Sequence, residues 1–126
     1  KGLSNKRLYE EIESSHYQKK SFTADCAEPK SIDELRGYGL RVEKSQKGKD
    51  SITHGIQYIQ DFEIIIHPRC VNFITEIGNY TWDEDRLGNK INRPIDDFNH
   101  LMDSMRYAVE KYAFGRVKVR TFKGGI

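Results

Sequence analysis

The sequence has no long apolar segment and only two cysteines among its 126 residues. No stretch approaches the roughly 20 apolar residues that a membrane-spanning helix needs, so we expect no membrane partner. The first residues are polar and lack the apolar region of a secretory signal peptide. Cys26 and Cys70 form no CxxC pair and fit no zinc-binding spacing, which favours two reduced thiols in a cytosolic protein.

Net charge is also small, at +2 from 21 basic and 19 acidic residues, but the basic residues are unevenly distributed. They gather in residues 41–49 and 115–126. In the first cluster Lys47 and Lys49 flank Gly48 just before a predicted helix, without the spacing of a Walker motif. Phosphate contact at that helix N-terminus is one explanation. Solvated lysines are the commoner explanation for either cluster alone.

Apolar periodicity and capping residues predict a chain in which helices alternate with strands. We expect helices over 4–18, 29–38, 50–59, 68–77 and 96–114, and strands over 21–25, 40–42 and 63–66. The last of these strands is a β-branched run that should be buried on both faces. Residues 80–82 and 117–119 are further extended candidates, and 83–94 reads as a polar loop.

This alternation predicts an α/β layered domain with a largely parallel sheet flanked by helices. The length suits a single domain over residues 1–126.

The last predicted helix carries Asp96, His100 and Asp103 at i, i+4 and i+7, which places them on one face. Mg²⁺ and Mn²⁺ bind carboxylate oxygens, and Mn²⁺ also accepts imidazole. The face could therefore supply metal ligands. The alternative is that Asp96 only caps the helix and that His100 and Asp103 make a solvated contact. Spacing alone favours the alternative.

A second acid, Asp25, ends a predicted strand just before a helix. The carboxyl ends of parallel strands are where α/β sheets place their functional sites. Asp25 could instead cap the following helix. That alternative is weaker because Asp25 lies four residues before Pro29, the expected first helical residue.

Two longer motifs resemble one protein family. Residues 25–35, DCAEPKSIDEL, resemble the D-x-A-E-P-K-S-I-x-E-L segment of the large terminase subunit of tailed bacteriophages. Residues 99–107, NHLMDSMRY, resemble that family's N-H-x-x-D-A-x-R-Y helix. The loop at 47–48 and the segment 66–70 are also similar, in the same order along nearly the whole chain.

The resemblance implies a C-terminal nuclease domain with a ribonuclease H-like fold. Such a domain is an endonuclease that cuts concatemeric double-stranded phage DNA during packaging, with two divalent ions, Mg²⁺ or Mn²⁺, held by three acids. The second family acid matches Asp25, the third matches Asp103, and the family histidine matches His100. Lys47 and Lys49 become candidate DNA contacts, and Asp96 becomes a helix cap.

The resemblance also implies other terminase subunits and the portal protein as partners of the full-length protein. The place of action would be the cytoplasm of the bacterial host of a phage or prophage.

The sequence departs from the family at the first acid, which normally bridges the metals from the first strand of the sheet. The acids upstream of Asp25, among them Glu10, Glu11 and Glu13, fall in a helical pattern. We therefore expect an N-terminally truncated fragment that lacks the first strands and is inactive alone. The alternatives are a non-catalytic module that docks on DNA or a packaging protein, and another ribonuclease H-like enzyme such as a resolvase or integrase. The long motif at 25–35 argues against the last.

Overall fold

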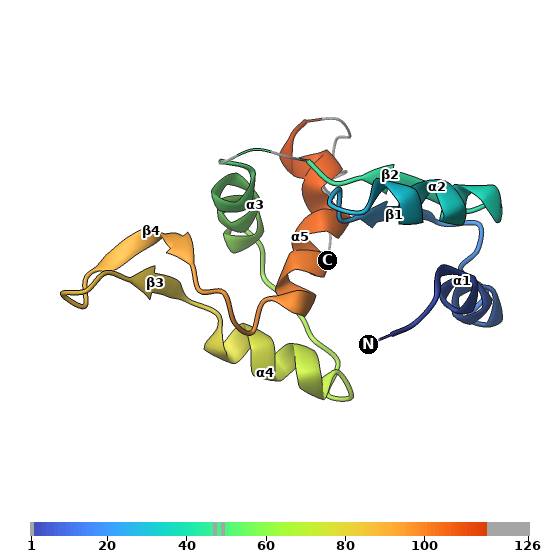
Figure 1. Cartoon of the computed structure of the whole chain (residues 1–126). Helices are drawn as coiled ribbons and strands as arrows, with labels where there is room; N and C mark the ends of the chain where they lie inside the picture. Colours follow the sequence, from blue (N-terminus) through green and yellow to red (C-terminus); the bar gives the residue numbers. More distant parts are fainter. Residues whose placement is uncertain (1, 47, 49, 116–126) are drawn as a thin grey trace, which may run out of the picture. The chain divides into compact units, whose positions relative to one another are not determined.

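The computed structural model describes residues 2–46, 48 and 50–115 (Figure 1). The extended piece expected at 117–119 lies outside them. The chain forms two compact units, Lys1–Lys47 and Gly48–Ile126. No helix in the described part of the chain is both long and apolar enough to cross a membrane.

The first unit is a strand–helix–strand motif preceded by a helix. Its elements are α1 (Asn5–Ser14), β1 (Ser21–Ala24), α2 (Pro29–Gly37) and β2 (Arg41–Lys44). β1 and β2 pair in parallel, with Ser21 opposite Arg41 and Ala24 opposite Lys44. The helix between two parallel strands is the α/β arrangement that the alternating pattern predicts, and the α/β fold class is confirmed.

Local sequence signals explain why these elements form. The Ser4 hydroxyl accepts a hydrogen bond from the Arg7 backbone N–H at 3.1 Å, which caps α1. Pro29 begins α2, where its missing N–H costs nothing. The unit is held together by an apolar core in which α2 and β2 meet and against which α1 and β1 pack. Its buried residues are Ile32, Leu35, Leu40 and Val42.

In the part that the structure describes, the second unit consists of three helices and a hairpin of two short strands. Its elements are α3 (Ser51–Gln60), α4 (Val71–Asn79), β3 (Trp82–Glu84), β4 (Lys90–Pro94) and α5 (His100–Ala113). α5 contacts both α3 and α4, and the hairpin extends away from the helices (Figure 1). Met102 of α5 is buried among them.

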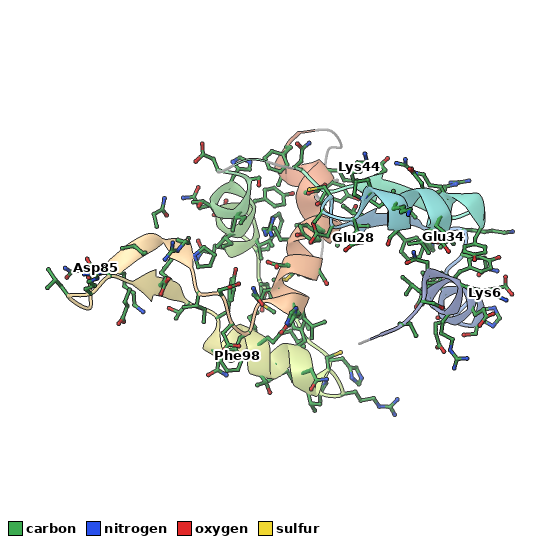
Figure 2. The ribbon with its side chains drawn as sticks, in the orientation of Figure 1. Lys6, Glu28, Glu34, Lys44, Asp85 and Phe98 are labelled. Atoms are coloured by element: carbon green, nitrogen blue, oxygen red, sulfur yellow. The ribbon has the colours of Figure 1, made fainter. Side chains whose placement is uncertain are left out.

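The segment 83–94 is not the polar loop that the sequence suggests, because β3 and β4 form an antiparallel hairpin there. Asp85 lies at its tip (Figure 2). The Asp85 carboxylate accepts hydrogen bonds from two backbone N–H groups of the turn, both at 2.9 Å. Gly88 takes a positive φ of 80°, which the reversal of the chain requires.

Charged side chains join the two strands of the hairpin. Lys90 pairs with Glu84 at 3.1 Å, and Arg93 pairs with Asp83 at 2.8 Å. Cross-strand pairs of this kind stabilise a hairpin without apolar alternation. The prediction of a loop failed because it relied on that alternation.

Residues 63–66, expected to be the most convincing strand, are not a strand. Within the described residues they pair with no other strand. The side chain of Ile65 is 88% exposed and that of Ile64 is 38% exposed, so the expected burial on both faces is also wrong. A β-branched run indicates strand propensity, but a strand forms only where a neighbour supplies its backbone hydrogen bonds.

The last helix begins later than predicted, at His100, with Asn99 as its N-cap. Phe98 adopts a left-handed backbone with φ of 50°, which interrupts any helix that starts at Asp96 or Asp97. Asp96 is therefore neither on the helix nor its cap. α4 also begins later than expected, at Val71 rather than Pro68.

Glu76 of α4 accepts a hydrogen bond from the start of α5. Its Oε2 accepts a hydrogen bond from the Leu101 backbone N–H at 2.7 Å. The N-cap Asn99 makes no side-chain capping bond itself. A carboxylate here satisfies a free N–H group and also interacts favourably with the positive end of the helix dipole.

Candidate functional site

Asp25 follows the last residue of β1, as predicted for an acid at the carboxyl end of a parallel strand. The N-cap of α2 is Glu28, so Asp25 does not cap that helix. Its Oδ1 instead accepts a hydrogen bond from the Ala27 backbone N–H at 3.0 Å. The side chain is exposed, and its position leaves the carboxylate accessible to a ligand.

Ser45 ties the carboxyl ends of the two parallel strands together beside Asp25. It is buried, and its backbone N–H donates to the Ala24 carbonyl oxygen at 2.8 Å. Its hydroxyl accepts a hydrogen bond from the Cys26 backbone N–H at 3.1 Å. These two bonds fix the backbone on both sides of Asp25.

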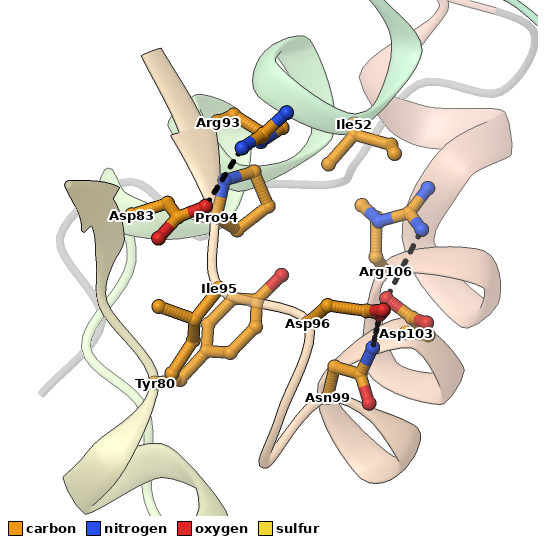
Figure 3. A pocket seen from close by; sticks show the side chains of 10 residues that line it. All are labelled: Ile52, Tyr80, Asp83, Arg93, Pro94, Ile95, Asp96, Asn99, Asp103 and Arg106. Atoms are coloured by element: carbon orange, nitrogen blue, oxygen red, sulfur yellow. Dashed lines mark hydrogen bonds and ion pairs between the residues drawn. The ribbon is translucent and has the colours of Figure 1, made fainter. Parts of the chain in front are cut away.

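Asp103 lines a pocket of about 520 Å³ in the second unit (Figure 3). We call it the Asp103 pocket. Residues from α3, the C-terminal end of α4, the hairpin, the segment that follows the hairpin, and α5 surround it. They are Ile52, Tyr80, Asp83, Arg93, Pro94, Ile95, Asp96, Asn99, Asp103 and Arg106. Four of these side chains carry carboxylate or amide oxygens, the donors that hard divalent cations prefer.

The Asp103 carboxylate pairs with Arg106, one turn further along α5. Oδ1 of Asp103 accepts a hydrogen bond from Nη2 of Arg106 at 3.2 Å. The Arg106 side chain is only 8% exposed, whereas that of Asp103 is 33% exposed. The acid is therefore more accessible than its cationic partner, although both side chains line the pocket.

Two further groups in the pocket have shifted pKa values. Burial raises the pKa of the Tyr80 hydroxyl, the charge of Asp103 raises it further, and Arg106 opposes the shift. Tyr80 keeps its proton at neutral pH, and its hydroxyl points toward the middle of the pocket (Figure 3). A hydrogen bond from Arg93 lowers the pKa of the Asp83 carboxyl, with help from the Glu84 backbone N–H.

The structure brings some of the predicted residues together. Asp96 and Asp103 line the same pocket, and Asp96 Oδ1 accepts a hydrogen bond from Asn99 Nδ2 at 3.2 Å (Figure 3). His100 is exposed at the first position of α5 and is not among the lining residues. Asp25 belongs to the first unit, which is described separately. Lys47 and Lys49 lie outside the described residues.

The described residues of each unit do not by themselves form a complete metal site. Among the residues that the structure describes, no three His, Cys, Asp or Glu side chains are close enough together to hold a metal ion. The Asp103 pocket nevertheless supplies an accessible carboxylate that is already fixed in place.

Arg106, Tyr80 and Gly55 are among the residues of this pocket and its wall that sequence reasoning did not identify. Arg106 has a local signal, because it lies three residues after Asp103 on the same helix. Tyr80 and Gly55, which packs against Arg106, come from other parts of the chain. No spacing within one element could have identified those two.

Comparisons with known proteins agree on one family. The model of the terminase RNase H-like domain matches residues 1–111. The large terminase subunit of Bacillus phage SPP1 is 35% identical over 86% of this chain and 27% of its own length. The PBSX phage terminase large subunit of Bacillus subtilis strain 168 is 27% identical over 96% of this chain and 28% of its own length. The chain thus spans just over a quarter of these relatives.

Solved structures show the same fold. The crystal structure of the large terminase nuclease domain from bacteriophage SPP1, with bound Mn, superposes with a TM-score of 0.80 and 34% identity. The match covers 87% of this chain and 64% of that one. The large terminase of a thermophilic bacteriophage matches with a TM-score of 0.67 and 22% identity, over 86% of this chain and 28% of its own. The ribonuclease H-like fold is confirmed.

Proposed function

This chain belongs to the terminase RNase H-like domain family, and we propose that it acts as part of the metal-dependent DNA endonuclease of a phage terminase. The reaction would be hydrolysis of phosphodiester bonds in concatemeric double-stranded DNA by a two-metal mechanism. The observation that carries the proposal is the Asp103 pocket, where an accessible carboxylate lies among other oxygen donors.

The donor set suits a hard divalent cation. Mg²⁺ and Mn²⁺ bind carboxylate, amide and water oxygens, and Asp83, Asp96, Asn99 and Asp103 present such oxygens to the pocket. The related SPP1 nuclease domain was solved with bound Mn, which supports the same class of ion here.

In this proposal Asp25 and Asp103 each supply a carboxylate ligand, and His100 joins or supports the site. Bound divalent ions would activate the attacking water and stabilise the leaving oxygen. The residues of this chain hold and orient their carboxylates for that role. Arg106 fixes Oδ1 of Asp103, and Ser45 fixes the backbone beside Asp25.

The remaining assignments rest on the family. Lys47 and Lys49 would contact the DNA backbone, since a cluster of basic residues favours phosphate oxygens. The proposed partners are double-stranded DNA and, for the whole terminase, its other subunits and the portal protein. The proposed place of action is the cytoplasm of the bacterial host.

Thermal unfolding with and without Mn²⁺ tests the metal assignment. An ion at 100 times its Kd should add about 2.7 kcal/mol to the free energy of unfolding. We expect Asp103→Asn to abolish this gain, because the amide retains the shape of the carboxylate but loses its charge. A parallel Asp25→Asn variant tests the second ligand.

Asp33→Asn is a matched control for Asp103→Asn. Asp33 also pairs with an arginine three residues later on a helix, Arg36 at 3.7 Å, but on the surface of the first unit. It should retain the full response to Mn²⁺. An undiminished response in Asp103→Asn would rule out the metal assignment. Salt-dependent DNA binding without cleavage in the intact protein would favour the docking module instead.

A further inference from the structure

Arg106 is a buried cation on α5 with a side chain that is only 8% exposed. Burying a guanidinium is unfavourable unless charged or polar partners compensate for the lost water. Asp103 is one such partner, at 3.2 Å. The ring of Tyr107 is another, with its centroid 4.8 Å from the guanidinium carbon. The buried guanidinium of Arg106 therefore lies beside the candidate metal ligand, Asp103.

Gly55 makes room for the aliphatic part of this side chain. Gly55 is buried within α3, and a Cβ placed on it would lie 2.7 Å from Cγ and 2.8 Å from Cδ of Arg106. Such separations are well below van der Waals contact, and both atoms lie in the middle of the side chain rather than at its flexible end. Any larger residue at 55 therefore forces Arg106 to move.

The glycine is otherwise unfavourable at this position. Glycine is a poor helix former compared with alanine, and Gly55 lies in the middle of a ten-residue helix. Its backbone is not in the left-handed region, so the conformation of the chain does not require it. The close approach of Arg106 is the feature that excludes a side chain here.

We propose that Arg106 is a positioning residue for the metal ligand Asp103, and that Gly55 is what allows Arg106 to reach it. Arg106 binds Oδ1 and restrains the carboxylate, which leaves Oδ2 for a divalent cation. The inference rests on the proposed function, since it takes Asp103 to be a metal ligand. Replacing a group that forms a hydrogen bond to a metal ligand commonly lowers metal affinity by about 10- to 100-fold.

Gly55→Ala tests the proposal without removing any charge from the site. The new methyl group displaces Arg106, and we expect Mn²⁺ affinity, measured by the electron paramagnetic resonance signal of free Mn²⁺, to fall about tenfold. Gly78→Ala is the matched control. Gly78 lies in α4, and a Cβ there would meet no atom within 4 Å. Its Mn²⁺ affinity should be unchanged.

A double-mutant cycle shows whether the effect passes through Arg106. In an Arg106→Ala background Cγ and Cδ are absent, so adding Gly55→Ala should change Mn²⁺ affinity no further. This double variant also relieves the overlap if Gly55→Ala alone fails to fold. An equal loss of affinity in both backgrounds, or no loss with Gly55→Ala alone, would overturn the proposal.

Failure of this inference is distinguishable from failure of the metal assignment. If Asp103→Asn abolishes Mn²⁺ binding while Gly55→Ala leaves it intact, Asp103 remains a ligand and Arg106 does not position it. If Asp103→Asn binds Mn²⁺ as well as the unmodified chain, the ligand assignment itself is wrong, and the positioning role falls with it.

Discussion

The hydrogen bond from the Leu101 N–H group to Glu76 should contribute measurably to stability. Glu76 reaches from α4 to the first turn of α5 and accepts this bond at 2.7 Å in a partly buried setting. A hydrogen bond to a charged group typically contributes about 1.5–3 kcal/mol. A negative charge at a helix N-terminus adds about 0.3–1 kcal/mol, part of which is already included in that range. We therefore expect Glu76→Ala to lower the free energy of unfolding by about 2 kcal/mol.

Glu76→Gln separates the two contributions. The amide oxygen can still accept the bond, but the charge is gone, so the expected loss is about 1 kcal/mol. Urea unfolding followed by circular dichroism measures both variants, with Glu84→Ala as the control. Glu84 makes an exposed ion pair with Lys90, and its removal should cost less than about 1 kcal/mol.

The result that would refute this reasoning is a loss below about 0.5 kcal/mol for Glu76→Ala, within the range of an ordinary surface substitution. An equal loss for the alanine and glutamine variants would refute only the part assigned to the hydrogen bond that the amide oxygen of glutamine can still accept. The first outcome would mean that water replaces Glu76 as the hydrogen-bond partner of the Leu101 N–H group. The start of α5, three residues before Asp103, would then be held by helix packing alone.

Further predictions concern the core of the first unit and the hairpin. Ile32→Ala should cost about 2–5 kcal/mol in urea unfolding, because this side chain is only 1% exposed. Leu87→Ser, at an 85% exposed position, should stay within about 0.5 kcal/mol of the unmodified chain. Arg93 lowers the pKa of Asp83 in the folded state. The ionised Asp83 carboxylate therefore stabilises the fold above its unfolded pKa of about 3.9. This contribution is lost as pH falls through the lower folded value. Acid unfolding curves should therefore show a smaller loss below pH 4 (about the unfolded value) in Arg93→Gln than in the unmodified chain.

The sequence predicted those elements whose signals are local. The helix that begins near Ser4, Pro29 at the start of α2 and the short strand before Asp25 each depend on neighbours a few residues away. The failures depended on distant partners or on a single backbone angle. Residues 63–66 have the composition of a strand but no neighbouring strand among the described residues. The start of α5 is set by the positive φ of Phe98.

The same distinction applies to the candidate site. Asp103 could be singled out because motif and spacing both lie on one helix. The contacts that hold it could not be predicted, because Glu76 meets Leu101 across 25 residues of sequence and Gly55 meets Arg106 from another helix. Neither contact produces a periodic pattern in the sequence, because each joins single residues of separate elements.

The close approach of Gly55 and Arg106 has an evolutionary consequence. Residues 55 and 106 cannot be substituted independently during evolution, because a methyl group at 55 and an arginine at 106 would occupy the same space. A lineage that acquires alanine at 55 gains helix propensity but must first shorten or redirect the side chain at 106. Relatives should therefore separate into two groups, one with glycine facing arginine and one with a larger residue facing a smaller one, with few intermediates between them.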